Sequence, residues 1–490
     1  MGNSYDADVN LIREKSKELE DRISPTFCLA KWHHTSIYCY SGQTHSCYHP
    51  SPHDIDVQEI KLNPAALHNT KQKKQERAEM LIGEKPKGCQ YCWNVESLDK
   101  KKDKAWDSSH ISDRMIRNNS IYTDDIVDEI IDQPWDYDVN PEYIEIAFHN
   151  ECNFKCGYCH PAVSSTFYNE MKKHGPFDMV KNHMLDISYI KKTKAEDENP
   201  YVKAWWEWWP TVSKTLNILR ITGGEPLLHK STWRLFEELK KDPKPHLEIN
   251  VNSNLGMSSR HVQKLGPVVN ELMDEGCIRK FKLFSSMDTW GKRAEYLRTG
   301  LDIELWEKNQ DIYLNDVKSH ITHMVTFNIL SVTSFTEFLQ KILDWRAKYN
   351  DVIPTLDPRY PLDRKIRFDT PYLKEPLQYD MHILPKEEYL PYFDKILKFI
   401  KDNMDEQDVT KFSELEYERF RRVRDYFADV QYDEDKVKEG RIDFYNWFNE
   451  LDRRRNTKFL DVFPDYTDFY NMCKELAEKK KENEIQVVQI

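Results

Sequence analysis

Strand-like and helix-like stretches alternate along the middle of the chain. Residues 143–148 form a short run of mostly apolar positions in which polar Glu145 alternates with apolar neighbours, a pattern typical of a β-strand. Similar stretches, separated by helix-like segments, follow at residues 216–222, 246–252, 280–285, 321–330 and 351–356. Strands that alternate with helices in this way predict βαβ units and a parallel sheet, so we expect an α/β fold.

The segments on either side of this pattern differ from it. Charged amphipathic runs at residues 389–403, 411–429 and 466–481 predict helices. Residues 101–140 are charged and interrupted by Asp, Asn and Pro, as in a linker, with a short helix expected near residues 123–132. The predicted organisation is therefore an N-terminal domain, a linker, an α/β domain and a helical C-terminal extension, with the bounds 1–100, 101–140, 141–370 and 371–490.

Three closely spaced cysteines, Cys152, Cys156 and Cys159, follow the first predicted strand. The loop after a parallel strand is a common place for an active site. Three protein thiolates leave one iron of a 4Fe-4S cluster open to a substrate or cofactor, whereas four close the cluster. Spacing alone also fits half of a zinc site with His149 or His160 as a further ligand, and this alternative remains open.

Two motifs in the α/β region resemble those of one enzyme family. The C-x3-C-x2-C spacing, with the aromatic Tyr158 directly before the third cysteine, resembles the signature of radical S-adenosylmethionine (SAM) enzymes. The loop 223–226, Gly-Gly-Glu-Pro, follows a predicted strand and resembles the second motif of that family. The resemblance implies a partial (βα)6 radical SAM barrel over residues 141–370, with an N-terminal auxiliary Fe-S domain and a C-terminal helical extension.

The same resemblance implies cofactors and their ligands. Cys152, Cys156 and Cys159 would hold a SAM-binding 4Fe-4S cluster, which reduces SAM to give a 5'-deoxyadenosyl radical that abstracts a substrate hydrogen. Glycines allow the backbone to approach a ligand closely. The implied SAM-binding residues lie at or near strand ends and are Tyr158, Gly223, Gly224, Glu225, Asn254, Ser286, Asp288 and Arg298.

Each of these residues has an implied part. Glu225 would accept a hydrogen bond from the SAM ammonium group, and Tyr158 would lie near the adenine. Arg298 would pair with the SAM carboxylate. Asn254 or Ser286 would bind the ribose. Asp288 would order either Arg298 or its own loop. A role in capping or in a turn is an equally good interpretation of the residues beyond the two motifs.

Four further cysteines, Cys28, Cys47, Cys89 and Cys92, precede the α/β region. They resemble the auxiliary-cluster region of SPASM and twitch domains, and four thiolates would close a second 4Fe-4S cluster. This pattern lies before the SAM-binding core, whereas SPASM domains usually follow it. A four-cysteine zinc site is the alternative.

Composition narrows the class of protein. The 490-residue chain has a net charge of −12 and ten cysteines. The negative charge argues against non-specific binding to nucleic acid. The cysteines are too sparse for a disulfide scaffold and cluster as metal ligands do, which predicts a reducing, cytoplasmic location. We expect neither a signal peptide nor a membrane span.

The leading functional hypothesis is oxidative modification of a peptide or protein by a radical SAM enzyme. Oxidation or rearrangement of a sugar or nucleoside is a second hypothesis, and a non-catalytic, zinc-stabilised binding protein is a third. The expected partners are a peptide or small-molecule substrate and an electron donor such as flavodoxin or ferredoxin.

Overall fold

A nine-stranded sheet forms the centre of the computed structural model, which describes residues 9–99, 112–121, 123–180, 187–188, 190, 193–353 and 363–488. The strand order is β11-β8-β7-β6-β5-β4-β1-β2-β3. The strands are β1 (His34–Tyr38), β2 (Gln43–His45), β3 (His53–Asp54), β4 (Tyr143–Ala147), β5 (Ile218–Thr222), β6 (Lys244–Ser253), β7 (Ile278–Ser286), β8 (Ile321–Met324) and β11 (Ile366–Asp369). From β11 to β1 every neighbouring pair is parallel, which confirms the predicted α/β fold.

The last parallel strand lies elsewhere than the sequence pattern predicts. Within the range 351–356, residues Val352–Ile353 form β9, which pairs with β10 (Asp363–Arg364) in a separate two-stranded sheet. The edge position next to β8 is taken by β11. Both stretches are short, and only pairing with a distant strand decides which of them joins the main sheet.

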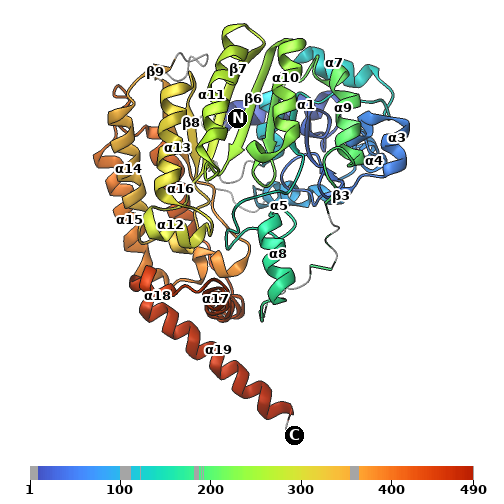
Figure 1. Cartoon of the computed structure of the whole chain (residues 1–490). Helices are drawn as coiled ribbons and strands as arrows, with labels where there is room; N and C mark the ends of the chain where they lie inside the picture. The colour runs from blue at the N-terminus through green and yellow to red at the C-terminus, as the bar shows by residue number, and fades with distance from the viewer. Residues whose placement is uncertain are drawn as a thin grey trace.

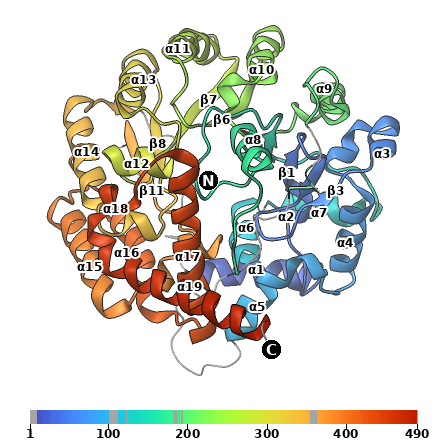
Figure 2. The same ribbon diagram turned by 60° about the horizontal axis from the view of Figure 1, so that its bottom comes forward.

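Helices cover the outer side of the parallel strands (Figure 1). In Figure 2, α10, α11, α13 and α14 form an arc outside β6, β7, β8 and β11. The helices of this central region are α8 (Ser165–His174), α9 (Pro200–Val212), α10 (Lys230–Lys241), α11 (Ser259–Asp274), α12 (Gly291–Leu297), α13 (Ile303–Asp316) and α14 (Phe335–Lys348). Short 3-10 turns in this region are η4 (Pro226–Leu228) and η5 (Ile329–Ser331).

The two faces of the sheet differ in exposure. Apolar residues such as Ile146 and Ile221 point to the helix layer and are fully buried. Polar residues at alternate positions, including Glu145 of β4 and Arg220 of β5, are only partly buried. Because side chains alternate across a strand, the helix-covered face forms the hydrophobic core and the opposite face is polar.

The N-terminal segment continues the same sheet. Strand β1 pairs in parallel with β4, and β2 and β3 extend the sheet in antiparallel fashion. A second, smaller hydrophobic core lies in this segment and includes Phe27, Trp32 and Trp93. Its helices are α1 (Val9–Arg22), α2 (Ala30–His33), α3 (Val57–Leu62), α4 (Lys71–Leu81), α5 (Gln90–Asp99), α6 (Asp113–Ile121) and α7 (Asp124–Asp132), with turns η1 (Pro64–Leu67) and η2 (Lys87–Cys89). The helix expected near 123–132 is thus confirmed, and the domain bounds stay predictions.

The C-terminal extension is helical, as predicted. It comprises α15 (Lys386–Asp402), α16 (Glu414–Asp429), α17 (Glu434–Arg455), α18 (Phe459–Val462) and α19 (Thr467–Val488), with turns η6 (Leu377–Tyr379), η7 (Met381–Ile383) and η8 (Pro464–Tyr466). Ser413 caps α16 and accepts a hydrogen bond from the Glu416 backbone, while the Glu416 side chain accepts one from the Ser413 backbone. Among the described residues, no helix is long and apolar enough to cross a membrane. The helix α19 extends away from the rest of the molecule in Figure 1.

Candidate active site

The three cysteines predicted to bind a cluster lie together in the loop after β4. Burial, together with the charge of the nearby Cys156 thiolate, raises the pKa of Cys152 to about 12. Burial likewise raises the pKa of Cys159, with contributions from both other thiols. The three sulfur atoms are therefore close enough to interact. Iron ligation would displace their protons, because thiolates are the metal-binding form.

Backbone hydrogen bonds hold this loop against a second loop of the barrel. The Lys155 amide donates to the Thr299 carbonyl at 2.9 Å, and the Gly157 amide donates to the Leu297 carbonyl at 3.0 Å. Gly300 has φ of +111°, and a Cβ there would lie 2.8 Å from the Asn153 carbonyl oxygen. A glycine is thus required where the two loops meet.

The Gly-Gly-Glu-Pro loop packs directly onto the start of the cysteine loop. A Cβ on Gly224 would lie 2.1 Å from the Glu151 carbonyl oxygen, and one on Gly223 would lie 2.6 Å from the His149 carbonyl oxygen. The Glu225 amide donates to the Glu151 carbonyl at 2.8 Å. The motif glycines therefore bring the ends of the neighbouring strands β4 and β5 into backbone contact.

The Glu225 side chain is fully buried between loops. Its Oε1 accepts hydrogen bonds from the Ser253 hydroxyl at 2.9 Å and from the Leu227 amide at 3.1 Å. Its Oε2 accepts one from the Asn254 amide at 2.6 Å. Burial raises the pKa of this carboxyl to about 7, although these hydrogen bonds oppose the rise. The side chain fixes the end of β6 to the motif loop, and its predicted contact with an ammonium group stays a prediction.

Asp288, Arg298 and Tyr158 form one buried network beside the cysteines. Arg298 Nη2 donates to Asp288 Oδ1 at 2.8 Å, and the Tyr158 hydroxyl donates to Asp288 Oδ2 at 2.6 Å. The Thr326 amide also donates to Asp288 Oδ1, at 2.9 Å. Asp288 thus holds the Arg298 guanidinium and joins its own loop to the segment after β8 through Thr326. Burial raises the pKa of Tyr158, so its phenol stays protonated.

The donors around the thiols suit an anionic cluster. Arg298 Nη1 lies 4.0 Å from Cys156 Sγ, and Asn254 Nδ2 lies 3.8 Å from Cys152 Sγ. The buried Nε of Arg298 has no hydrogen-bond partner within the described part of the chain. Ser286 ends β7 at the same edge of the sheet. Cationic and N–H donors near sulfur stabilise the negative charge of an iron-sulfur cluster, so these residues fit the predicted group.

The other four predicted cysteines also come together, although they come from three segments of the chain. Cys28, Cys47, Cys89 and Cys92 line one small cavity, called here the four-thiol cavity. Burial raises the pKa of Cys28 to about 12, with contributions from the Cys47 and Cys89 thiols. The Ser46 hydroxyl on its wall is buried and has no hydrogen-bond partner among the described residues. Its free donor suits an anionic group inside the cavity.

The described side chains do not form a site for a single metal ion. No group of three or more His, Cys, Asp and Glu residues in the described ranges is arranged to hold one. A structural zinc site needs four ligands in a tight tetrahedron with Zn–S distances of about 2.3 Å. The zinc alternative stays a prediction, which metal analysis of the purified protein tests.

The C-terminal extension contributes contacts that the sequence did not predict. A Cβ on Gly157 would lie 2.0 Å from the Tyr379 hydroxyl oxygen, so η6 packs directly on the cysteine loop. Arg455, at the end of α17, donates to Glu170 Oε2 at 2.8 Å and to the Thr299 hydroxyl at 3.0 Å. Glu170 also accepts a hydrogen bond from Lys155 within the cysteine loop at 2.8 Å. The only sequence signal for this contact is the glycine between the second and third cysteines.

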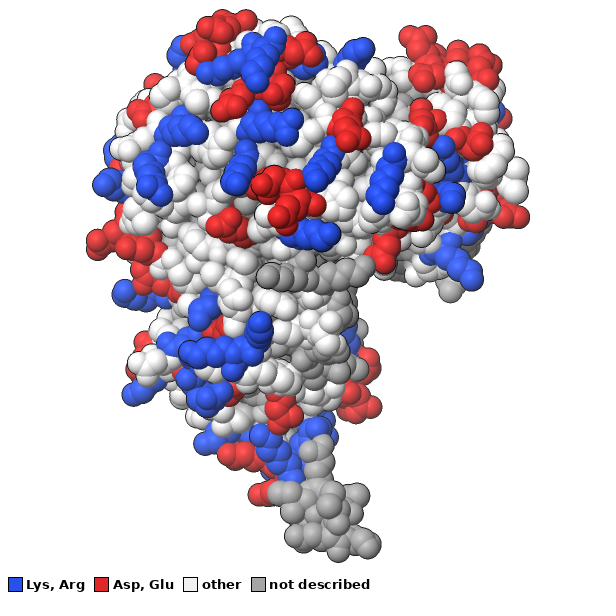
Figure 3. Space-filling model, turned by 45° about the vertical axis from the view of Figure 1, so that its right-hand side comes forward, with Lys and Arg blue, Asp and Glu red and all other residues white. Residues whose placement is uncertain are grey.

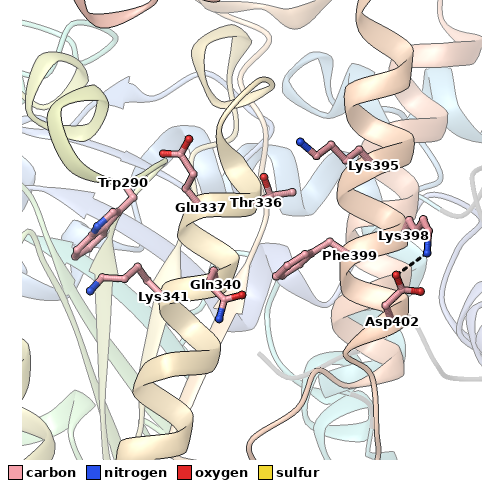
Figure 4. A pocket seen from close by; sticks show the side chains of 9 residues that line it. All are labelled: Trp290, Thr336, Glu337, Gln340, Lys341, Lys395, Lys398, Phe399 and Asp402. Atoms are coloured by element: carbon pink, nitrogen blue, oxygen red, sulfur yellow. Dashed lines mark hydrogen bonds and ion pairs between the residues drawn. The ribbon is translucent and has the colours of Figure 1, made fainter.

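A separate groove on the molecular surface contains none of the predicted residues. It has a volume of about 670 Å³ and lies between α14 and α15 (Figure 4). Its lining includes Trp290, Lys341 and Phe399, with charged side chains of both signs. Positive and negative side chains are also interspersed over the face drawn in Figure 3. These surfaces add nothing to the candidate site.

Comparison with known proteins agrees with the motifs. No protein-family model matches the chain. A stretch of 126 residues, 26% of this chain, is 29% identical to the GTP 3',8-cyclase of Campylobacter jejuni subsp. doylei and spans 30% of that protein. A solved structure described as native anSMEcpe with bound AdoMet and Kp18Cys peptide is 14% identical. That match covers 53% of this chain and 61% of the other, with a TM-score of 0.31.

The cysteine triplet follows β4 and the Gly-Gly-Glu-Pro loop follows its parallel neighbour β5. Together with the match to the cyclase, these features support a relationship to the radical SAM superfamily. Such a relationship implies a 4Fe-4S cluster and SAM as cofactors. The chain spans less than a third of the curated relative, so the activity of the whole protein is treated below as a proposal.

Proposed function

We propose that this protein reductively cleaves SAM and abstracts a hydrogen atom from a substrate. The observation that supports this proposal is the contact between two motifs far apart in sequence. The Gly-Gly-Glu-Pro loop lies in backbone contact with the loop of Cys152, Cys156 and Cys159. The site combines three thiols, closely approaching glycines and a buried guanidinium, which are the groups that a SAM-bound cluster requires.

Each residue then has a defined part. Cys152, Cys156 and Cys159 hold the cluster, and Gly223 and Gly224 let the backbone approach the methionine end of SAM. When bound, the cluster and SAM supply the one-electron cleavage that yields a 5'-deoxyadenosyl radical.

The other residues of the site bind and orient SAM. Arg298 binds the SAM carboxylate, and its guanidinium is oriented by Asp288. Tyr158 lies near the adenine, and Asn254 or Ser286 hydrogen-bonds the ribose.

The four-thiol cavity holds a second 4Fe-4S cluster in this proposal. Its fit is supported by four thiols on one cavity and by the cationic side chains of Lys31, Arg114 and Arg117 on the same wall. A cluster with four thiolates carries net negative charge, which these cations and the unpartnered Ser46 hydroxyl would stabilise. Four protein ligands close a cluster, which favours electron transfer over direct binding of substrate.

A second redox centre favours net oxidation of the substrate. The leading substrate class is a peptide or protein side chain. Hydrogen abstraction removes one electron and one proton together. A substrate radical that then gives an electron to the second cluster and a proton to a base completes a two-electron oxidation. A nucleoside or sugar substrate is the second candidate, because the curated relative is named a GTP cyclase. Electrons for SAM cleavage would come from a carrier such as flavodoxin or ferredoxin.

The proposal is tested with full-length protein reconstituted anaerobically with iron and sulfide. After dithionite reduction with SAM, we expect 5'-deoxyadenosine from the unchanged protein. We expect none from C152A, C156A or C159A, and a reduced, uncoupled yield from C89A. Cys277 is buried outside both sites, so C277A is the control and should behave like the unchanged protein. Equal yields of 5'-deoxyadenosine from C152A and C89A would contradict the different roles assigned to the two sets of cysteines. Purified protein that contains zinc and no sulfide would contradict the proposal itself.

A further inference from the structure

Lys31 lies at the boundary between the four-thiol cavity and an open polar pocket. The pocket has a volume of about 870 Å³ and shares with the cavity the lining residues Lys31, Ser46, His49 and Pro50. The Lys31 side chain is 2% exposed. It follows Cys28 by three residues, and its amide donates to the Cys28 carbonyl at 2.9 Å. Lys31 lines the four-thiol cavity together with Cys89.

The wall of the four-thiol cavity carries an excess of positive charge. Lys31, Arg114 and Arg117 line it, with Asp113 as the single carboxylate among the described residues that do so. Arg114 is neutralised by Glu20 at 2.9 Å and Glu96 at 2.8 Å, neither of which lines the cavity.

The carboxylate partner of Lys31 is Glu76, which lines the polar pocket instead of the cavity. Lys31 therefore lines the cavity that the thiols line, while its carboxylate partner lines only the polar pocket. A positive charge nearer to the cavity stabilises added negative charge there more strongly than a carboxylate farther from it offsets, because Coulomb energy falls with distance.

At the site of the three cysteines after β4, the positive and negative side chains pair with one another. Arg298 pairs with Asp288 at 2.8 Å, and both Lys155 and Arg455 pair with Glu170 at 2.8 Å. Each described cation there faces a carboxylate of the same site. The two sites thus differ in the electrostatic field that their own side chains provide.

We propose that Lys31 makes the group in the four-thiol cavity an electron acceptor, by raising its reduction potential, and that Glu76 limits this effect from the pocket side. The inference rests on the proposed function, since it takes an iron-sulfur cluster to be the group that the four cysteines hold. Net charge and hydrogen bonds to sulfur are among the properties that set the potential of such clusters. Reduction adds one electron beside the ammonium group, so the reduced form is the one that Lys31 favours.

The test isolates this group in full-length protein that carries C152A, C156A and C159A. After anaerobic reconstitution, its midpoint potential is read from a redox titration followed by low-temperature paramagnetic resonance. We expect K31M to lower the equilibrium constant for one-electron reduction at least tenfold, which is a shift of 59 mV to more negative potential. We expect E76Q to shift the midpoint in the opposite direction. K31R keeps the charge and should keep the midpoint near that of the parent protein.

Lys85 provides the matched control. It lines the same polar pocket with its ammonium over the Trp93 ring at 5.4 Å, but it does not line the cavity. K85M should leave the midpoint unchanged. If the K31M variant does not bind a cluster in the four-thiol cavity, the midpoint potentials of E76Q and K31R still test the inference. An iron-sulfur signal whose midpoint moves in neither K31M nor E76Q would overturn this inference alone. Zinc without iron in the parent protein would instead overturn the second-cluster part of the proposed function.

Discussion

Asp288 holds Arg298 beside the cysteine triplet through a hydrogen bond of 2.8 Å from Arg298 Nη2 to Asp288 Oδ1. The remaining Nη1 of Arg298 lies 4.0 Å from Cys156 Sγ, between the thiols and the end of β7. Asp288 thereby fixes the direction of a guanidinium that has spare donors. A buried cation with spare donors is a binding group for a carboxylate.

We predict that D288N weakens SAM binding by roughly ten- to a hundredfold, because a charge-assisted hydrogen bond is worth about 1.5–3 kcal/mol. The measurement is equilibrium binding of SAM to the reconstituted protein. Asp302 caps the N-terminus of α13, and Asn is an equally good cap, so D302N is the control and should bind SAM normally. If D288N binds SAM with unchanged affinity, Arg298 does not need its hydrogen bond to Asp288 in order to bind SAM.

The approach of Gly224 to Glu151 gives a second prediction. An alanine methyl group there would lie 2.1 Å from a backbone oxygen, so the two motif loops must separate in G224A. We expect a loss of stability of about 3 kcal/mol or more, together with loss of 5'-deoxyadenosine formation. Urea unfolding and product analysis measure the two effects. Gly276 has φ of +67° but open space around it, so G276A should cost only about 1 kcal/mol and keep activity.

Glu225 predicts a pH dependence of stability. Its pKa is raised from 4.5 to about 7 in the folded protein, chiefly by burial. Between these values the folded chain binds more protons than the unfolded chain, so stability falls as pH rises through this window. The full change is on the order of 3 kcal/mol. Urea unfolding between pH 5 and about 7.5 should show this decline, and it should be smaller in E225Q. If the free energy of unfolding of E225Q falls equally steeply with pH, other titrating groups cause the decline.

The contact of α17 with the cysteine loop predicts that the C-terminal extension protects the cluster. Arg455 and Glu170 are both almost fully buried, so R455M leaves a buried carboxylate with Lys155 as its remaining ion-pair partner. We expect a loss of about 3 kcal/mol in stability and faster loss of iron on exposure to air. Iron content is followed over time by a chromogenic chelator. Arg453 is exposed and pairs only with Glu450 among the described residues, so R453M should lose iron at the rate of the unchanged protein.

Local motifs allowed much of the site to be predicted from the sequence. Cys152, Cys156 and Cys159 lie within one loop, so their spacing alone brings them together. Gly223 and Gly224 follow a strand that pairs with the strand before the cysteines, and parallel βαβ units place such loops at one edge of the sheet. The helices of the C-terminal extension were recognisable from amphipathic periodicity.

Features that depend on distant pairings were not predictable in this way. Strand β11 and the pair β9 and β10 have similar local patterns, and only contact with β8 selects the edge strand. The pairing of Arg455 with Glu170 joins residues 285 positions apart, and no local periodicity encodes it. For Asp288 the sequence left open whether it orders Arg298 or its own loop, and its hydrogen bonds to Arg298 and Tyr158 join segments that are distant in the sequence.

Strand β1 has a consequence for the spacing of the two cysteine sites. It begins six residues after Cys28 and lies in register beside β4, which leads into the cysteine triplet, while β2 leads towards Cys47. A continuous ladder of interstrand hydrogen bonds, and not a flexible tether, therefore sets the distance between the two cysteine sites. In the function proposed above, this sheet would act as a fixed spacer between the two redox centres.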